Sequence, residues 1–171
     1  RGPQAGELAC RLADGWHAVN YTRDGLRERL ADLERGAELG DRSVDDLRVT
    51  LSVGCCALAD ADRARDLLVQ HTAFYIGGMG TFYRDNLARQ GHEETANAIY
   101  DNWQDGEKGA AMEALSDDLL EEIAVWGTPD GALEHFERFT DIDGVDTVSV
   151  SFPRGADLDQ IDSTVRALAP Q

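Results

Sequence analysis

Alternation of apolar and small polar residues marks two strands in this chain. In residues 147–152 every second residue is apolar, and those between are threonine or serine. Residues 47–58 repeat the pattern. One face of this second segment carries Val49, Leu51, Val53 and Cys55, and the other carries Thr50, Ser52, Gly54 and Cys56. Because successive residues of a strand point to opposite faces of its sheet, each strand has one apolar face and one small, polar face.

Helical periodicity surrounds these strands. Apolar residues recur every three or four positions after Pro3, after Asp24, after Pro129 and after Asp157. Thr128 is a good N-cap for the third of these helices, and proline is well tolerated at the first helical position. A short strand, residues 16–19, follows the first helix. A repeated order of helix, turn, strand, turn and helix predicts a parallel α/β fold.

The polar faces of the two long strands bear on function. A buried parallel strand is usually apolar on both faces. Small polar residues on one face are typical of a barrel lumen near a polar ligand, whereas an edge strand with one face in water is the alternative for a single strand. Two strands with this pattern favour the barrel.

Residues 60–125 hold no strand candidate and are predicted to be helical throughout, with breaks at 77–80, 91, 105–106 and 116. This is much longer than one crossover helix. Insertions of this kind usually lie at the carboxyl ends of strands, over the functional site. The aromatic residues of the insertion are spaced for packing between helices.

Composition narrows the class of protein. The length of 171 residues fits one domain, residues 1–171, and a start at Arg1 rather than methionine indicates an excerpt of a longer protein. The formal charge is −17, with 33 acidic residues against 16 basic ones spread along the chain. A dispersed acidic surface is typical of halophilic proteins, whose compact state is destabilised by self-repulsion at low salt.

The same composition argues against several partners. We expect no nucleic-acid partner, because no basic patch is present to neutralise phosphates. No apolar run is long enough to span a membrane and no signal peptide is visible, so the predicted location is the cytoplasm. Cys10, Cys55 and Cys56 form neither a disulfide framework nor a metal-binding spacing, and no metal site is predicted.

No motif for nucleophilic or zinc catalysis occurs in the chain. His17, His71, His92 and His135 show no ligand spacing. His17 lies on a short strand near the predicted rim, where a packed or capping role is the commoner one, and His135 is expected to be half-exposed. Residue chemistry alone therefore predicts an acidic, soluble α/β domain whose strand ends suit a polar ligand.

The order of several segments adds a resemblance. These segments are Gly2-Pro3 before a helix that leads into Leu12-Ala13-Asp14-Gly15-Trp16, the strand to Ala59 followed by Asp60-Ala61-Asp62-Arg63-Ala64-Arg65, Ala73-Phe74-Tyr75 with Phe82-Tyr83, and Trp126-Gly127-Thr128-Pro129 with Gly144-Val145-Asp146. Together they resemble the luciferase-like monooxygenase family, which includes oxidoreductases that use the deazaflavin coenzyme F420.

The resemblance implies a fold. The family fold is a (β/α)8 TIM barrel with insertions, about twice as long as this chain. The chain would then be the C-terminal part of such a barrel, with its last three strands and a long helical insertion at about 60–125. The resemblance assigns no catalytic residue here, because most catalytic candidates of the family lie in the earlier strands. A homo-oligomer is expected.

The resemblance also implies site residues. In the family the loop containing Gly-Pro contacts the cofactor, which implies Gly2 and Pro3 as cofactor-binding residues. Arg1 extends this set, because a guanidinium suits phosphate. The strand after Asp14-Gly15 ends at the substrate side, which implies Asn20 and Tyr21 as substrate-binding residues.

The function implied is that of an F420-dependent oxidoreductase, similar to methylenetetrahydromethanopterin reductases. A hydride would pass between the reduced deazaflavin and a small organic substrate, folate-like or another carbonyl or imine. Three alternatives remain open: an FMN-dependent monooxygenase, a non-catalytic half-barrel that pairs with another chain through its exposed strand edges, and an unrelated α/β binding domain with an open sheet.

Overall fold

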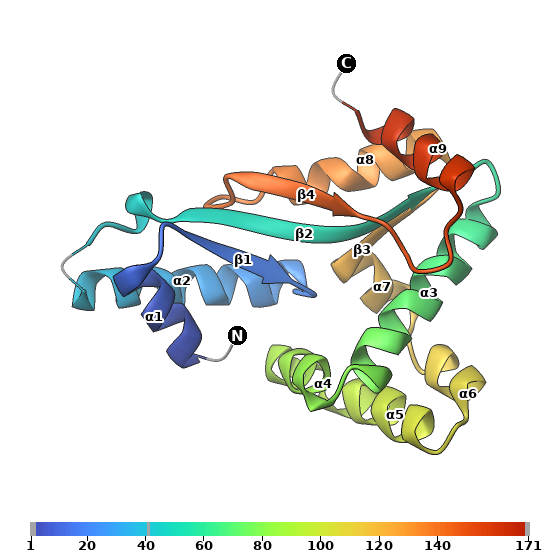
Figure 1. Cartoon of the computed structure of the whole chain (residues 1–171), viewed down its shortest axis with the longest axis horizontal. Coiled ribbons are helices and arrows are strands. Elements are labelled where there is room, and N and C mark those ends of the chain that lie inside the picture. The colour runs from blue at the N-terminus through green and yellow to red at the C-terminus, as the bar shows by residue number, and fades with distance from the viewer. Residues whose placement is uncertain (1–2, 41, 170–171) are drawn as a thin grey trace.

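One long strand, β2 (Arg48–Ala57), pairs with every other strand of the sheet. The structure is a computed structural model that describes residues 3–40 and 42–169 (Figure 1). Its other strands are β1 (Gly15–Val19), β3 (Ala124–Gly127) and β4 (Thr147–Ser151), and all the pairings are parallel.

The register places the strands on the two edges of β2. Ser52 pairs with Val19 of β1 and with Ser149 of β4, so β1 and β4 lie on opposite edges. Gly54 pairs with residues of both β3 and β4. Strand β3 therefore pairs with the same edge of β2 as β1 does, further along β2. Within the described residues, β1 and β4 have no strand on their outer edges.

Helices connect and cover the strands. Their bounds are α1 Pro3–Leu12, α2 Arg23–Leu39, α3 Ala61–Gly78, α4 Thr81–Leu87, α5 Glu93–Gln104, α6 Lys108–Glu113, α7 Asp117–Ile123, α8 Pro129–Thr140 and α9 Leu158–Leu168, with a π-helical turn at Ala88–His92 and a 3-10 turn at Val44–Asp46. No helix in the described parts of the chain has the length and apolar character that crossing a membrane requires.

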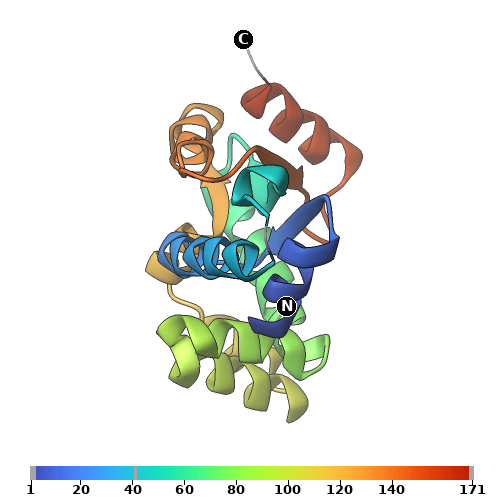
Figure 2. The ribbon, with the colours of Figure 1, turned by 90° about the vertical axis from the view of Figure 1, so that its left-hand side faces the viewer.

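The two faces of β2 enter different cores, as the alternation predicts. Leu51, Val53 and Cys55 are buried in an outer core with residues of α2, α8 and α9. Cys56 joins an inner core built mainly by α3 and α5–α7. Figures 1 and 2 show α8 and α9 well separated from α4–α6, with the strands between them. The sheet therefore carries one fully packed face and one face that the insertion covers in part.

Side-chain caps explain where several helices begin. Thr22 accepts a hydrogen bond from the backbone N–H of Gly25 at 3.0 Å, and Thr128 accepts one from Gly131 at 3.4 Å. Asp60 caps α3 in the same way. Each satisfies one of the backbone donors that a helix start leaves free. The prediction of Thr128 as the cap of α8 is confirmed.

One strand was not predicted. Residues 60–125 were expected to hold no strand, but β3 begins at Ala124, directly after α7. The strand has only four residues, too few to show an alternation of apolar and polar positions between two helices. Val125 is fully buried in the outer core, and Trp126 packs against the inner one.

We expect Gly77→Ala to destabilise the fold, although alanine normally favours a helix by about 1 kcal/mol. Gly77 lies in the last turn of α3, where a Cβ atom would come within 2.4 Å of the Cβ atom of Trp103 on α5. Neither atom is the end of a flexible side chain, so overpacking should lower the free energy of unfolding by about 1–3 kcal/mol. Urea unfolding measures this change.

The matched control is Gly109→Ala in α6, where an added Cβ atom meets no atom within 4 Å. This variant should be as stable as the parent or more stable, by up to about 1 kcal/mol. Equal effects of the two substitutions would contradict the packing of α3 against α5.

Candidate functional site

A cavity of about 280 Å³ lies over the inner face of the sheet. Its sheet wall comes from four strands: Val19 at the end of β1 with Asn20 directly after it, Ser52 and Gly54 in the middle of β2, Ser151 at the end of β4, and Ala124 at the start of β3. The carboxyl ends of parallel barrel strands are where ligands bind in α/β barrels. The small, polar face of β2 and β4 is thus the floor of a cavity.

The helical insertion supplies the opposite wall. Leu68, His71, Thr72 and Tyr75 line the cavity from successive turns of α3, and Tyr83 lines it from α4. Leu68 and Thr72 are four residues apart, as are His71 and Tyr75, so each pair lies one helical turn apart on one face. The glycine at position 54 matters here, because a Cβ atom would lie only 3.2 Å from the side chain of Leu68.

The lining mixes polar and apolar side chains and carries no permanent charge. Its described residues offer hydroxyl, amide and imidazole groups, and none is an aspartate, glutamate, lysine or arginine. No group of three histidine, cysteine or carboxylate side chains in the described residues is arranged to hold a metal ion. In a chain of net charge −17, the cavity is a neutral region suited to an uncharged polar group.

His71 is the titratable side chain of this cavity whose state is perturbed. Its Nδ1 atom accepts a hydrogen bond from the backbone N–H of Arg154 at 3.0 Å. Burial and the positive charge of Arg154 lower its pKa to about 4. The ring is therefore neutral at pH 7, and because Nδ1 is an acceptor, Nε2 carries the proton.

Aromatic rings fix the surroundings of His71. The imidazole lies against Tyr75 with ring centroids 4.7 Å apart, and Tyr75 contacts Tyr83 edge to face at 5.0 Å. The guanidinium of Arg154 lies over the ring of Phe74, 4.0 Å from its centroid. The loop after β4 is thus attached to α3 at two points, through Phe74 and through His71.

Asn20 ends β1 in a left-handed conformation, with φ of 55°. Asparagine tolerates this region better than most residues, and such backbone often marks a functional site. Its carbonyl oxygen accepts hydrogen bonds from the side chain of Asn86 at 3.0 Å and of Gln90 at 3.2 Å. The insertion therefore holds the backbone of the loop that contributes Asn20 to the cavity.

Gln90 makes a second set of contacts to the same loop. Its side-chain oxygen accepts hydrogen bonds from the backbone N–H of Thr22 at 2.7 Å and from the Thr22 hydroxyl at 3.2 Å. Gly25 leaves room for the Gln90 side chain, since a Cβ atom there would lie 2.4 Å from it. Gln90 lies in the π-helical turn after α4, a distortion that often accompanies functional sites.

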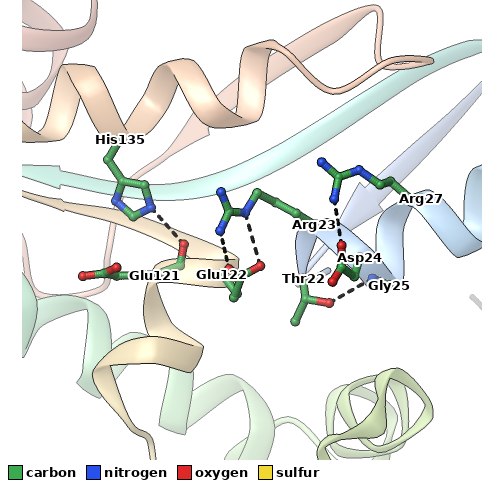
Figure 3. A network of polar contacts seen from close by, with 8 residues as sticks. All are labelled: Thr22, Arg23, Asp24, Gly25, Arg27, Glu121, Glu122 and His135. Carbon is green, nitrogen blue, oxygen red and sulfur yellow. Dashed lines mark hydrogen bonds and ion pairs between the residues drawn. The ribbon is translucent and has the colours of Figure 1, made fainter.

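A polar network joins α2, α7 and α8 (Figure 3). Arg23 forms a two-point ion pair with Glu122, with one N–O distance of 3.2 Å. The Nε2 atom of His135 lies 2.9 Å from the carbonyl oxygen of Glu121. The expectation that His135 is half-exposed was wrong: it is 8% exposed, and burial lowers its pKa.

The predicted substrate residues have different positions. Asn20 lines the cavity. Tyr21 is 5% exposed and buried in the outer core, where its ring contacts Trp16 with centroids 5.7 Å apart. The structure thus brings Asn20, and not Tyr21, to the cavity. A substrate role for either residue stays a prediction.

The predicted cofactor residues lie at the start of the chain. Pro3 is the first residue of α1, and Arg1 and Gly2 fall outside the described residues. His17 is exposed on β1, beside Thr50 of β2, and does not line this cavity. The residues that sequence reasoning missed are those of α3 and α4, above all His71. Its four-residue spacing from Tyr75 was the available signal, but packing between helices produces the same spacing.

Comparisons of the sequence and of the structure with known proteins point to the same family. Residues 1–146 match the sequence profile of a family described as luciferase-like monooxygenase. A protein of Mycobacterium tuberculosis named as a coenzyme F420-dependent oxidoreductase is 24% identical over 135 residues, which are 75% of this chain and 39% of that protein.

Solved structures share the fold. The coenzyme F420-dependent tetrahydromethanopterin reductase of Methanopyrus kandleri matches with a TM-score of 0.72 and 24% identity, over 96% of this chain and 46% of that one. An F420-dependent secondary alcohol dehydrogenase in complex with an F420-acetone adduct matches with a TM-score of 0.64 and 16% identity, over 99% and 47%. The chain spans less than half the length of these proteins, and the predicted fold, part of a (β/α)8 barrel, is confirmed.

We expect Gln90→Leu to destabilise the protein by about 1–3 kcal/mol, because the backbone N–H of Thr22 loses its partner and the carbonyl of Asn20 loses one donor. Urea unfolding measures the loss, and amide hydrogen exchange at Thr22 should accelerate. The control Gln70→Leu changes an exposed residue of α3 and should stay within about 0.5 kcal/mol of the parent. Unchanged exchange at Thr22 in Gln90→Leu would rule out this contact.

The lowered pKa of His71 predicts a pH dependence of stability. Between the ordinary pKa of 6.5 and the folded pKa of about 4, the unfolded chain binds the proton that the folded chain rejects. The free energy of unfolding should therefore fall as pH decreases through this window, by roughly 3 kcal/mol from this group. Urea unfolding from pH 7 to pH 4 should show a shallower decline in His71→Gln. His92→Gln, outside the cavity, should retain the parent slope.

Proposed function

Because the chain belongs to the luciferase-like monooxygenase family, we propose that it forms part of an oxidoreductase that binds coenzyme F420. In this proposal a hydride passes between the deazaflavin and a small organic substrate at the cavity of Asn20, Ser52 and His71. The observation that carries the proposal is the uncharged cavity at the carboxyl ends of the parallel strands β1 and β4. The relative and the two solved structures compared above, each named for its dependence on F420, support the choice of cofactor.

The lining residues fit the ring of a deazaflavin. Such a ring presents carbonyl and N–H groups, which match the amide of Asn20 and the hydroxyl of Ser52. The phosphate-bearing tail of the cofactor has no charged partner in the lining, so it would lie outside the cavity. When bound, the cofactor supplies the hydride chemistry.

The residues of this chain then have three tasks. Gly54 and the serines of β2 and β4 leave space over the sheet floor, because their side chains are small. Tyr75 and Tyr83 present aromatic surface that limits the access of water to the cavity. Asn86 and Gln90 hold the carbonyl of Asn20, and so fix the loop that borders the cavity.

FMN-dependent monooxygenation is the second candidate. FMN-bound monooxygenases share this fold, and a neutral cavity also suits an isoalloxazine ring. Pairing of the free edges of β1 and β4 with another chain, in a homo-oligomer or a half-barrel partner, is compatible with either cofactor.

The test is a fluorescence titration of the protein with F420 and, separately, with FMN in 2 M KCl, which screens the acidic surface. We expect saturable binding of F420 and none of FMN. Ser52→Val should raise the dissociation constant for F420 about tenfold, because a hydroxyl partner is lost from the cavity floor. Ser149→Val, on the same face of neighbouring β4 but outside the cavity lining, should change it less than about twofold.

Each other outcome has a defined meaning. Binding of FMN alone would replace the proposal with the monooxygenase. Binding of neither cofactor, together with a dimer in gel filtration, would favour the half-barrel that pairs with another chain.

A further inference from the structure

One ring nitrogen of His71 is hydrogen-bonded to the protein, and the other is available to a ligand. Nδ1 is engaged by the backbone N–H of Arg154 at 3.0 Å. Nε2 has no hydrogen-bond partner in the described residues, and it is not sealed from solvent. A histidine in this arrangement is a hydrogen-bond donor without a protein acceptor.

Contacts from Arg154 and Tyr75 hold the imidazole of His71 in place. Arg154 follows β4, and its backbone position is held because its guanidinium lies on Phe74, three residues from His71 along α3. The imidazole is also packed against Tyr75. Both the ring orientation and the tautomer are therefore set before any ligand arrives, which lowers the entropic cost of forming one more hydrogen bond.

The rest of the cavity limits what can accept that hydrogen bond. A carboxylate ligand would find no arginine or lysine in the described lining, because the guanidinium of Arg154, beside His71, lies over Phe74 and outside the lining. A cationic ligand would find no aspartate or glutamate there. Burying either charge without a partner is strongly unfavourable. The hydroxyl of Ser151 is occupied as a donor, because it bonds to the carbonyl of Val53 at 3.1 Å.

We propose that His71 donates a hydrogen bond from Nε2 to the carbonyl oxygen or imine nitrogen of an uncharged substrate, and that it selects such substrates over carboxylates of the same shape. The identification of this ligand as a substrate rests on the proposed function. The hydrogen bond itself does not need the cofactor. On a carbonyl oxygen that gains negative charge during reduction, the same donor would stabilise that charge.

The first measurement uses the protein labelled with ¹⁵N-histidine at pH 7, without cofactor. Long-range ¹H–¹⁵N spectra, assigned by comparison with His71→Gln, should show the neutral tautomer protonated at Nε2. Titration with cyclohexanone should shift the Nε2 signal saturably, whereas cyclohexanecarboxylate at equal concentrations should not. A ring protonated at Nδ1, or an equal response to ketone and carboxylate, would overturn the proposal.

Two variants separate the hydrogen bond from packing. His71→Phe keeps a ring but removes the donor, and should weaken cyclohexanone binding about tenfold. His71→Gln places an amide N–H near the position of Nε2, and should restore binding to within about threefold of the parent. Unchanged ketone binding in a folded His71→Phe variant would refute the role of the donor.

The result is independent of the cofactor assignment. If the ketone shifts His71 but F420 does not bind, the proposed function fails and the His71 inference stands. If F420 binds and the ketone leaves the His71 signal unchanged, the proposed function stands and the His71 inference fails.

Discussion

The pairing of β2 on both edges is the constraint on which this structure depends. Residues 50–54 pair with β4 on one edge and, in part, with β1 on the other, while β3 takes over the β1 edge at Gly54. Parallel pairing in register brings the carboxyl ends of β1 and β4 beside the middle of β2, and so brings Asn20, Ser52 and Ser151 to one cavity. Because a shift by one residue would turn every side chain to the opposite face, the apolar outer face of β2 also determines which groups reach the cavity.

The insertion adds a second constraint, on the loops rather than on the strands. Side chains from α4 and the π-helical turn hold the backbone at Asn20, and α3 holds the loop after β4 through His71 and Phe74. Two loops from opposite edges of β2 are thus fixed by one helical unit. The insertion therefore fixes both borders of the cavity as one structural unit.

The sequence predicted the parts of this architecture that repeat, and missed those that depend on single contacts. Alternation along residues 47–58 and 147–152 identified the faces of β2 and β4, and the order of segments identified the family. Neither pattern extends to Asn20 and Tyr21, which follow β1, so the sequence did not show which of the two lines the cavity. His71 could not be singled out, because its role follows from a backbone N–H that lies 83 residues away in sequence.

The distribution of charge connects the surface to the cavity. With 33 acidic and 16 basic residues, the protein repels anions at low ionic strength, yet the described lining of its cavity has no ionised group. An uncharged substrate is insensitive to this field, whereas a cofactor with a phosphate-bearing tail has to approach against it. In molar salt the screening length falls to about 3 Å, so the repulsion is confined to direct contacts and the neutral cavity decides binding. The neutral cavity beneath this acidic surface thus holds, in its described lining, no ion pair that high salt would weaken.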